Sequence, residues 1–395
     1  MPRIPLFQTR IALIQAFLRR YSYDGILLNR VDNYAMATGG CLNGVNMFSD
    51  IGANALFVTR DGQPYYVGNN IEAPRQLEEE LAGQDCGVID FLWCEGSPAE
   101  AAARRFSGAV VSDDGSLGKN VHADLAPLRA TLTPEELEKY RALGKRAATA
   151  MTAALDAIEP GWTEGDVAAR LAAEIAGQRC RAPVVLVAAD DRLPRYRHPA
   201  PRVAPLLGDP ASERPIQRYV MAVSGVQAEG LVCSITRFKR IGDLPPGIAD
   251  AHARICGVDA AFQEATRIGR SLGDVFADGC RAYEALGFTR DEWRNHHQGG
   301  ATGYGARTCK GAPGETFAVL DQSWRSALRD ILGADVPLGA VFAWNPSGPG
   351  VKSEDTFILY PDGAQEIVTQ TPDLPRVDLA RVIGRETSVI KSGIA

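Results

Sequence analysis

The sequence predicts a two-domain protein of mixed α/β (α+β) class. Three observations carry this prediction: the length of the chain, an alternation of helical and strand patterns in its first third, and one strong helix start near residue 131. At 395 residues the chain is long enough for two or three domains. Its hydrophobic content of 45% and charged content of 23% are typical of a globular protein with a sizeable core.

The first third of the chain alternates between helical and strand patterns. An amphipathic helix is expected over residues 9–21, because apolar residues recur there at helical spacing. Short apolar runs bounded by turn residues predict strands at residues 25–28, 54–59, 63–67, 87–93 and 108–112. Together these elements are expected to form one mixed-sheet domain.

The domain boundary is expected just before a helix start. Residues 131–136 (TLTPEE) place a hydroxyl, a proline and a glutamate in the order typical of a capped first turn. This divides the chain into domains 1–131 and 132–395. In the second domain, two helices followed by strands are expected twice, which predicts two similar halves packed around one site. The expected helices cover residues 134–157, 164 onwards, 246–266 and 271–286, and the strands cover 184–188, 219–224, 230–238, 341–344 and 356–360.

Charge and composition exclude several classes of partner. A net charge of −6 gives no basic footprint, so neither nucleic acid nor an anionic membrane is an expected partner. The start of the chain does not resemble a signal peptide, and no apolar run approaches the length of a membrane-spanning helix, so a cytoplasmic location is expected. The eight cysteines lack CxxC spacing and are expected to be buried thiols rather than metal ligands.

Four short motifs in the second domain carry a family resemblance. They are residues 160–164 (PGWTE), 234–237 (SITR), 345–346 (NP) and 353–356 (SEDT). With residues 34–39 (YAMATG) in the first domain, they resemble the pita-bread hydrolases, which include creatinase, aminopeptidase P, prolidase and methionine aminopeptidase. The resemblance implies a creatinase-type N-terminal α/β domain and a pita-bread catalytic domain with a pseudo-twofold duplication.

The resemblance also identifies the positions of the family's metal ligands. Its metallopeptidases hold two divalent cations with two aspartates, one histidine and two glutamates. Motif by motif, these ligands fall on Val223, Ser234, His297, Asn345 and Glu354. One imidazole and one carboxylate cannot neutralise or bridge two metal ions, so we expect no metal and no other cofactor. A single ion on His297, Glu354 and Asn345 is the alternative.

The pattern is similar to creatinase, in which a loop histidine handles protons without a metal. The matching segment, residues 190–199, makes His198 the candidate base, although a loop histidine that bonds its own backbone is the alternative. Arg195 and Arg197, with Arg192 close by, predict a fork for an anionic group of the substrate. The alternative is a solvated loop, because surface arginines are common.

The glycine-rich segment 296–307 (HHQGGATGYGAR) is expected to supply further site residues. His297 is its candidate catalytic histidine, and Tyr304 and Gln298 are candidates to donate hydrogen bonds to an oxyanion. A tight glycine turn with a half-buried tyrosine is the alternative. The opposite wall is expected to carry Ser234, Asn345 and Lys352 as substrate contacts, with Glu354 holding a cationic amidino group.

These assignments predict a metal-independent hydrolase that cuts a C–N bond in a small, amino-acid-like, anionic substrate. One alternative is a metallopeptidase for Xaa-Pro peptides with an atypical metal site, and another is a catalytically inactive binding module. The polar replacements argue against decay of the site, because buried polar groups are costly unless they are used. A lyase or isomerase reaction stays open. The resemblance further implies a homodimer in which the N-terminal domain of one subunit closes over the site of the other.

Overall fold

The structure is a computed structural model that describes residues 4–46, 48–201, 214–321, 325–326, 329–331 and 338–395. The chain forms two compact units. The first comprises Met1–Glu135 with Glu229–Leu231 and Gln322–Leu338, and the second comprises Glu136–Ala228 with Val232–Asp321 and Gly339–Ala395. The first unit thus continues to Glu135 and includes two later segments, whereas the sequence placed a single boundary at residue 131. No helix among the described residues is long and apolar enough to span a membrane.

The first unit is built on a mixed six-stranded sheet with the strand order β4-β3-β2-β1-β5-β6. Phe57 of β2 stacks on Phe106 at 4.0 Å between ring centroids, within a core that includes Leu27 of β1. The strands are β1 (Gly25–Arg30), β2 (Ile51–Thr59), β3 (Pro64–Asn69), β4 (Gly87–Phe91), β5 (Val110–Ser112) and β6 (Lys119–Asn120). The helices are α1 (Ile4–Tyr21), α2 (Val31–Thr38), α3 (Ala73–Arg75), η1 (Gln76–Glu80), α4 (Pro98–Arg105), η2 (Ala123–Leu125) and α5 (Ala126–Ala130).

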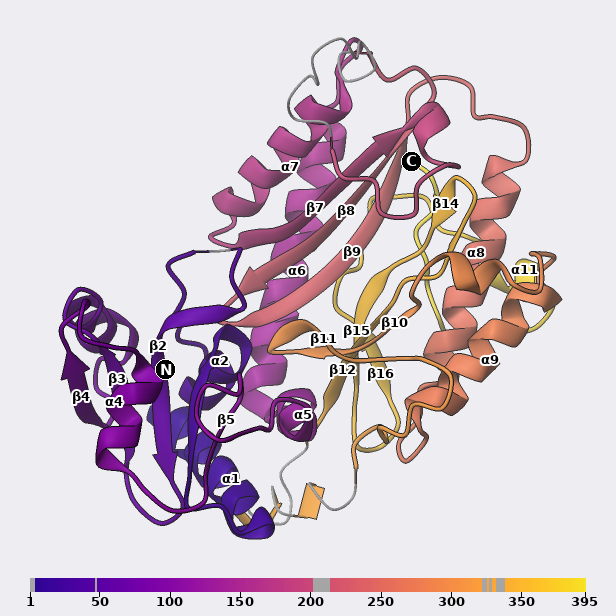
Figure 1. Cartoon of the computed structure of the whole chain (residues 1–395). Helices are drawn as coiled ribbons and strands as arrows, with labels where there is room; N and C mark the ends of the chain where they lie inside the picture. Colours follow the sequence, from indigo (N-terminus) through magenta and orange to yellow (C-terminus); the bar gives the residue numbers. More distant parts are fainter. Residues whose placement is uncertain (1–3, 47, 202–213, 322–324, 327–328, 332–337) are drawn as a thin grey trace. The chain divides into compact units, whose positions relative to one another are not determined.

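The second unit repeats one order of elements, two helices followed by antiparallel strands (Figure 1). The first set contains α6 (Pro134–Asp156), α7 (Glu164–Gly177), β7 (Arg181–Ala189), η3 (Asp190–Arg192), β8 (Tyr219–Ala228) and β9 (Leu231–Arg240). The second set contains α8 (Ile248–Ala265), α9 (Leu272–Ala285), η5 (Glu292–Asn295), β10 (Gly299–Gly303), β11 (Gly305–Lys310), β12 (Ala340–Trp344), β13 (Ser347–Gly348), β14 (Val351–Lys352), β15 (Asp355–Leu359), β16 (Gln365–Ile367) and α11 (Leu379–Ile383). The mixed α/β class and the expected order of elements are confirmed.

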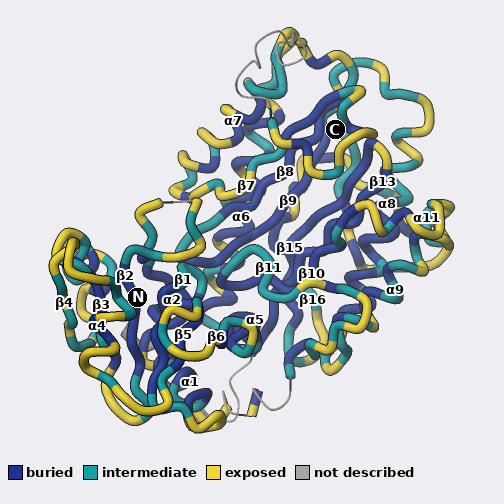
Figure 2. The backbone as a smooth tube through the Cα atoms, viewed as in Figure 1, coloured by how far each residue is buried: buried dark blue, intermediate teal, exposed yellow. Residues whose placement is uncertain are grey.

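Local sequence explains where the helices of the second unit begin. Thr163 accepts a hydrogen bond from the backbone of Asp166, and the Asp166 carboxylate accepts one from the backbone of Thr163, so α7 starts with a capping box. Val167 and Ala168 of α7 then pack against Val187 of β7. Strand β8 is buried along most of its length (Figure 2). Val220 on one face packs in a cluster with Val167 of α7, and Val223 on the other face lines the cavity described below.

The two sheets of the second unit join where β9 meets β15. The backbone N–H of Ser234 donates to Thr356 Oγ1 at 2.8 Å, and Thr356 Oγ1 donates to the Ser234 carbonyl at 2.9 Å. One step along, the backbone N–H of Thr236 donates to the Glu354 carbonyl at 3.2 Å. These bonds place Ser234 and Glu354 side by side, although 120 residues separate the motifs that contain them.

One segment differs from its expected conformation. The glycine-rich residues 299–310 form the hairpin β10–β11 inside the five-stranded sheet β11-β10-β12-β15-β16, whereas a glycine turn was the alternative considered. Gly299 and Gly300 have positive φ angles of 94° and 147°. A Cβ atom on Gly299 would lie 2.2 Å from the Ala343 carbonyl oxygen, so β12 leaves no room for a side chain there. The close approach fixes the chain immediately after His297.

Candidate active site

A cavity of about 310 Å³ lies in the second unit where the two sheets meet. Strands β7, β8, β9, β11 and β14 supply its walls, together with one residue from each of four connecting segments. It is lined by Val184, Leu186, His198, Val223, Ser224, Gly225, Ser234, His297, Ala306, Arg307, Asn345, Lys352 and Glu354. Six of the ten site residues expected from the sequence therefore lie together.

All five positions that the resemblance matches to metal ligands line this cavity. They are Val223, Ser234, His297, Asn345 and Glu354, which come from β8, β9, the loop before β10, the residue after β12 and the residue before β15. The motif-by-motif matching thus selects residues that fold to one place. Val223 has no donor atom, and Ser234 and Asn345 carry no charge, so this set does not fit a pair of divalent cations.

Arg307 of β11 occupies the space between two of these positions. Its Nη2 donates to Glu354 Oε1 at 2.8 Å, and its Nη1 donates to Ser234 Oγ at 3.1 Å. The second carboxylate oxygen of Glu354 accepts from Thr236 Oγ1 at 2.7 Å. A fixed guanidinium therefore neutralises the carboxylate that a metal ion would otherwise need, which is a second reason that the family's metal pair does not fit.

Lys352 brings a second positive charge to the cavity. Its side chain is buried, and burial lowers the pKa of its ammonium group to about 8. The described residues place no carboxylate within 4.0 Å of its Nζ, which instead lies 3.3 Å from His296 Nε2. With Arg307 and Lys352 against the single carboxylate of Glu354, the cavity is electrostatically suited to an anion.

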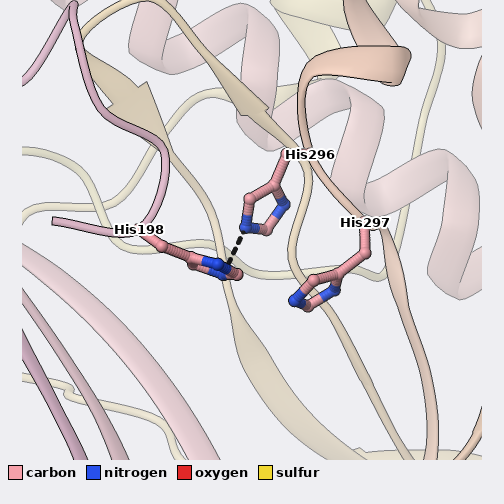
Figure 3. A group of neighbouring side chains, drawn as sticks. All are labelled: His198, His296 and His297. Atoms are coloured by element: carbon pink, nitrogen blue, oxygen red, sulfur yellow. Dashed lines mark hydrogen bonds between the residues drawn. The ribbon is translucent and has the colours of Figure 1, made fainter.

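Three histidines lie close together (Figure 3), and two of them, His198 and His297, line the cavity. His198 follows η3 on a loop, whereas His296 and His297 are consecutive residues between η5 and β10. His198 Nε2 lies 2.8 Å from His296 Nε2, and the rings of His296 and His297 stack at 4.4 Å between centroids. Figure 3 shows the three rings facing one another.

These histidines are neutral near pH 7. Burial, assisted by the charge of Lys352, lowers the pKa of His198 below its usual value. Burial and the nearby Arg307 lower the pKa of His297 to about 3. The pKa of His296 lies far below its usual range, because this ring is buried and faces Lys352. Neutral rings keep one nitrogen lone pair each, as a general base requires.

Four other predicted site residues lie outside the described lining of the cavity. Tyr304 is buried and donates its hydroxyl to Glu136 Oε1 at 2.7 Å. Gln298 accepts from the Tyr283 hydroxyl at 2.9 Å and donates to the His296 carbonyl at 2.6 Å. Both side chains are thus engaged in structural hydrogen bonds, and the spacing that suggested an oxyanion role for them does not bring them to the cavity.

Arg195 and Arg197 do not form the expected fork. Arg195 is exposed, and Arg197 forms an ion pair with Glu292. Their neighbour Arg192 pairs with Glu164 at the start of α7. Each of the two pairs uses a carboxylate from a distant segment, which the local sequence did not reveal. Arg307 and Lys352 are the cations that actually line the cavity.

Sequence reasoning missed Arg307 and His296 as site residues. The sequence carried no clear signal for Arg307, because residues 305–310 (GARTCK) show no alternation of apolar and polar residues and β11 is uniformly half-buried up to its last residue. His296 adjoins the predicted His297, but consecutive residues of extended backbone usually point to opposite sides, so no sequence pattern indicated that both rings would gather.

Comparison with known proteins supports the fold described above. A model of the metallopeptidase family M24 matches residues 138–357. Dipeptidase PepE from Mycobacterium ulcerans is similar in structure, at 18% identity and a TM-score of 0.69 over 93% of this chain and 96% of that one. The prolidase from Pyrococcus horikoshii OT3 shows 14% identity and a TM-score of 0.68 over 92% and 98%.

A further similar structure is the N-terminal domain of the FACT complex subunit SPT16 from Cicer arietinum, at 11% identity and a TM-score of 0.61 over 93% and 97%. No curated protein matches the chain. The solved structures show the same pita-bread fold with its N-terminal domain. Because the family match extends over more than half of the sequence, the chain belongs to the metallopeptidase family M24.

Proposed function

We propose that this M24 member is a metal-independent hydrolase that cuts a C–N bond in a small, anionic, amino-acid-like substrate. The observation that carries the proposal is the position of Arg307. Its guanidinium bonds Ser234 and Glu354, two of the five residues at the family's metal positions, and Lys352 adds another cation to the same cavity. The cavity is therefore arranged for a negatively charged molecule rather than for two metal ions.

The residues of the cavity suffice for hydrolysis without a metal. His198 is accessible and neutral, so it can take a proton from water that attacks the scissile carbon. Lys352 and Arg307 can stabilise the negative charge that develops on the attacked group. Lys352 can also return a proton to the leaving nitrogen, because its lowered pKa makes it a better acid than an exposed lysine.

Glu354 and Asn345 are suited to orient the substrate. The Glu354 carboxylate is held by two donors, Arg307 and Thr236, and faces the cavity, where it can accept a hydrogen bond from a cationic or amidino nitrogen. Asn345 Oδ1 is buried and has no hydrogen-bond partner among the described residues. An unsatisfied buried acceptor of this kind is expected to gain its partner from a ligand.

An Xaa-Pro dipeptidase with an atypical metal site is the second candidate. It is favoured by the names of the similar structures, which include a dipeptidase and a prolidase. The ligand set argues against it, because His297 and Glu354 supply only one imidazole and one carboxylate, and Arg307 already holds the carboxylate. Metal content and chelator sensitivity separate the two candidates.

The purified protein is expected to contain no stoichiometric manganese, cobalt, iron or zinc. Its activity is expected to survive treatment with a chelator, since the charge of Arg307 replaces that of an ion. Elemental analysis after mild purification, followed by assays with and without chelator, measures both properties. Two tightly bound ions per chain, or activity that is lost on chelator treatment and restored by metal, would contradict the metal-independent hydrolase and favour the Xaa-Pro dipeptidase.

Small carboxylates are expected to stabilise the protein through Arg307. A thermal-shift screen of carboxylates, guanidino acids and proline dipeptides should detect ligands, because a ligand at a hundred times its Kd adds about 2.7 kcal/mol to the free energy of unfolding. Hits are then tested as substrates by release of an amine. Arg307→Ala is expected to weaken binding by about 1.5–3 kcal/mol, and Arg307→Lys by less.

The matched control for this screen is Arg195→Ala, because Arg195 is an exposed arginine outside the described lining. It is expected to leave binding unchanged. Equal losses in Arg307→Ala and Arg195→Ala, or a screen in which no anion shifts the melting temperature, would contradict the anionic substrate.

A homodimer is the expected assembly, as the family resemblance implies. The first unit exposes Phe48, Ile71 and Trp93, whose exposed fractions are 97%, 61% and 64%. The backbone N–H of Trp93 donates to Asn70 at 2.9 Å, so Ile71 and Trp93 lie at the same end of the sheet, where β3 and β4 both terminate. Exposed apolar side chains of this size are typical of association surfaces.

Light scattering at micromolar concentrations is expected to give twice the monomer mass of 42.4 kDa. The double variant Phe48→Ser, Trp93→Ser is expected to lower the measured mass towards that of a monomer. The control Leu92→Ser changes a neighbouring residue of lower exposure, 48%. A wild-type chain that stays monomeric would remove the dimer from the proposal.

A further inference from the structure

His198 and His297 of the cavity form a cluster with the adjacent His296, and the hydrolytic proposal uses this cluster only in part. Only His198 has a chemical role in it, whereas His296 and His297 lie beside it. The described residues contain one group of at least three potential metal ligands whose donor atoms all lie within 4.8 Å of one another. This group is His198, His296 and His297. Three of the five histidines of the chain are thus concentrated at one point.

The geometry of this cluster is close to that of a three-histidine metal site. Zinc binds imidazole nitrogens at about 2.0–2.1 Å in a tetrahedron, which separates the nitrogens by roughly 3.3 Å. His198 Nε2 and His296 Nε2 are 2.8 Å apart, and the remaining separations reach 4.8 Å at most. Side-chain shifts of about 1 Å would therefore place all three nitrogens around one ion.

The hydrogen bonds of the cluster are incomplete. The Nδ1 atoms of His296 and His297 are buried, and neither has a hydrogen-bond partner among the described residues. His198 and His296 face each other through the same ring nitrogen, Nε2, which permits at most one proton between them. A divalent ion would accept both of these lone pairs at once, which a proton cannot do.

Two nearby cationic side chains, Lys352 and Arg307, are expected to affect how tightly a metal ion binds. Lys352 Nζ lies 3.3 Å from His296 Nε2, whereas the charge of Arg307 is balanced by Glu354. An ion in the cluster would therefore be repelled mainly by Lys352. The site is expected to be empty at the trace metal levels of purification buffers and to fill when zinc is added.

We propose that His198, His296 and His297 form a binding site for one zinc-class divalent cation, which is distinct in its ligands from the metal pair of the family. It shares only His297 with the five positions described above. Neutral imidazole is the ligand that Zn²⁺, Co²⁺, Ni²⁺ and Cu²⁺ prefer, and water from the cavity can complete a tetrahedral coordination. Hard, oxygen-preferring cations such as Mg²⁺ and Ca²⁺ are not expected to bind here.

Such an ion would act as an inhibitor of the proposed hydrolase. Coordination uses the His198 lone pair, and the same lone pair is needed to take a proton from water. This consequence, unlike the binding itself, rests on the proposed function. The test therefore measures binding without any substrate, so a failure of the hydrolase leaves the metal site testable and the reverse also holds.

The test is a titration of the chelator-treated full chain with Zn²⁺ alone at pH 7.5, in competition with a chromophoric zinc indicator. One equivalent is expected to bind per chain. His198→Ala, His296→Ala and His297→Ala are each expected to lower the affinity by at least about tenfold. Lys352→Met is expected to raise it, because the opposing charge is removed. The matched control His122→Ala changes a histidine of the first unit and should have no effect.

Co²⁺ provides a second readout that reports geometry. A tetrahedral three-histidine site is expected to give a visible absorption band with the wild-type chain and none with His296→Ala. Should an alanine variant fail to fold, its glutamine counterpart takes its place, after thermal unfolding has shown a native transition. Lack of saturable binding, or binding that survives any one of the three substitutions undiminished, would overturn the three-histidine site.

Discussion

Replacing His198 with alanine is expected to lower turnover by about two to four orders of magnitude while leaving substrate affinity nearly unchanged. The reason is that a general base acts in the transition state, where it accepts a proton from the attacking water. His198 is suited to this because it is accessible, lines the cavity and has a lowered pKa that keeps it neutral near pH 7. Neither His296 nor His297 is as exposed.

The measurement is a comparison of kcat and KM between the wild type and His198→Ala, on a substrate found in the anion screen. His122→Ala is the control, since His122 belongs to the first unit. His296→Gln is expected to have a smaller effect than His198→Ala, because His296 contacts His198, the proposed base, and does not line the cavity. Full activity of His198→Ala would mean that the base must be sought at His297 or Lys352.

Replacing Arg237 with methionine is expected to cost about 3–5 kcal/mol of the free energy of unfolding, a large share of the stability of a typical domain. Arg237 of β9 is 3% exposed, and its side chain donates five hydrogen bonds. One of them binds Asp355 Oδ1 at 2.6 Å, so removal of the guanidinium would leave a buried carboxylate without this partner. Another reaches the Glu354 carbonyl at 3.2 Å and thereby holds a residue of the cavity.

Urea unfolding measures the loss, with attention to whether the m-value stays constant. Arg240→Met is the matched control, because Arg240 lies on the same strand and its pair with Asp243 is exposed. It is expected to cost about 0–1 kcal/mol. Arg237→Lys, which keeps the charge but loses the planar fork, should fall between the two. Similar losses in Arg237→Met and Arg240→Met would show that the network does not stabilise the fold as inferred.

The sequence predicted much of the fold because its elements are locally encoded. Residues 131–136 specify the start of α6, and Thr163 and Asp166 specify the start of α7. The strands β8 and β9 follow from long apolar runs. In contrast, β10 and β11 were not predicted, since a strand held by Gly299 and Gly300 depends on the close approach of β12 and has no β-propensity of its own.

The site residues that belong to recognisable motifs could be predicted from the sequence. Those whose position depends on contacts between distant segments could not. His297, Ser234, Asn345 and Glu354 fall in motifs and converge on the cavity. Tyr304 was selected by spacing alone, and its hydroxyl bonds Glu136 of α6 instead. The roles of Arg197 and Arg307 depend on which carboxylate each one meets, Glu292 or Glu354, and no local pattern encodes a pairing across such distances in the chain.

The position of Arg307 determines what a single acidic substitution in the cavity would do. A carboxylate introduced at Ser234 alone would meet the guanidinium that now lies 3.1 Å from the serine hydroxyl. It would form an ion pair with Arg307 and keep the guanidinium in its present position, rather than bind a metal ion from solution. A two-metal ligand set like that of the family would need acidic residues at Val223, Ser234 and Asn345 together with the removal of Arg307. While Arg307 is present, a single acidic substitution at Ser234 is therefore expected to add an ion pair rather than a metal site.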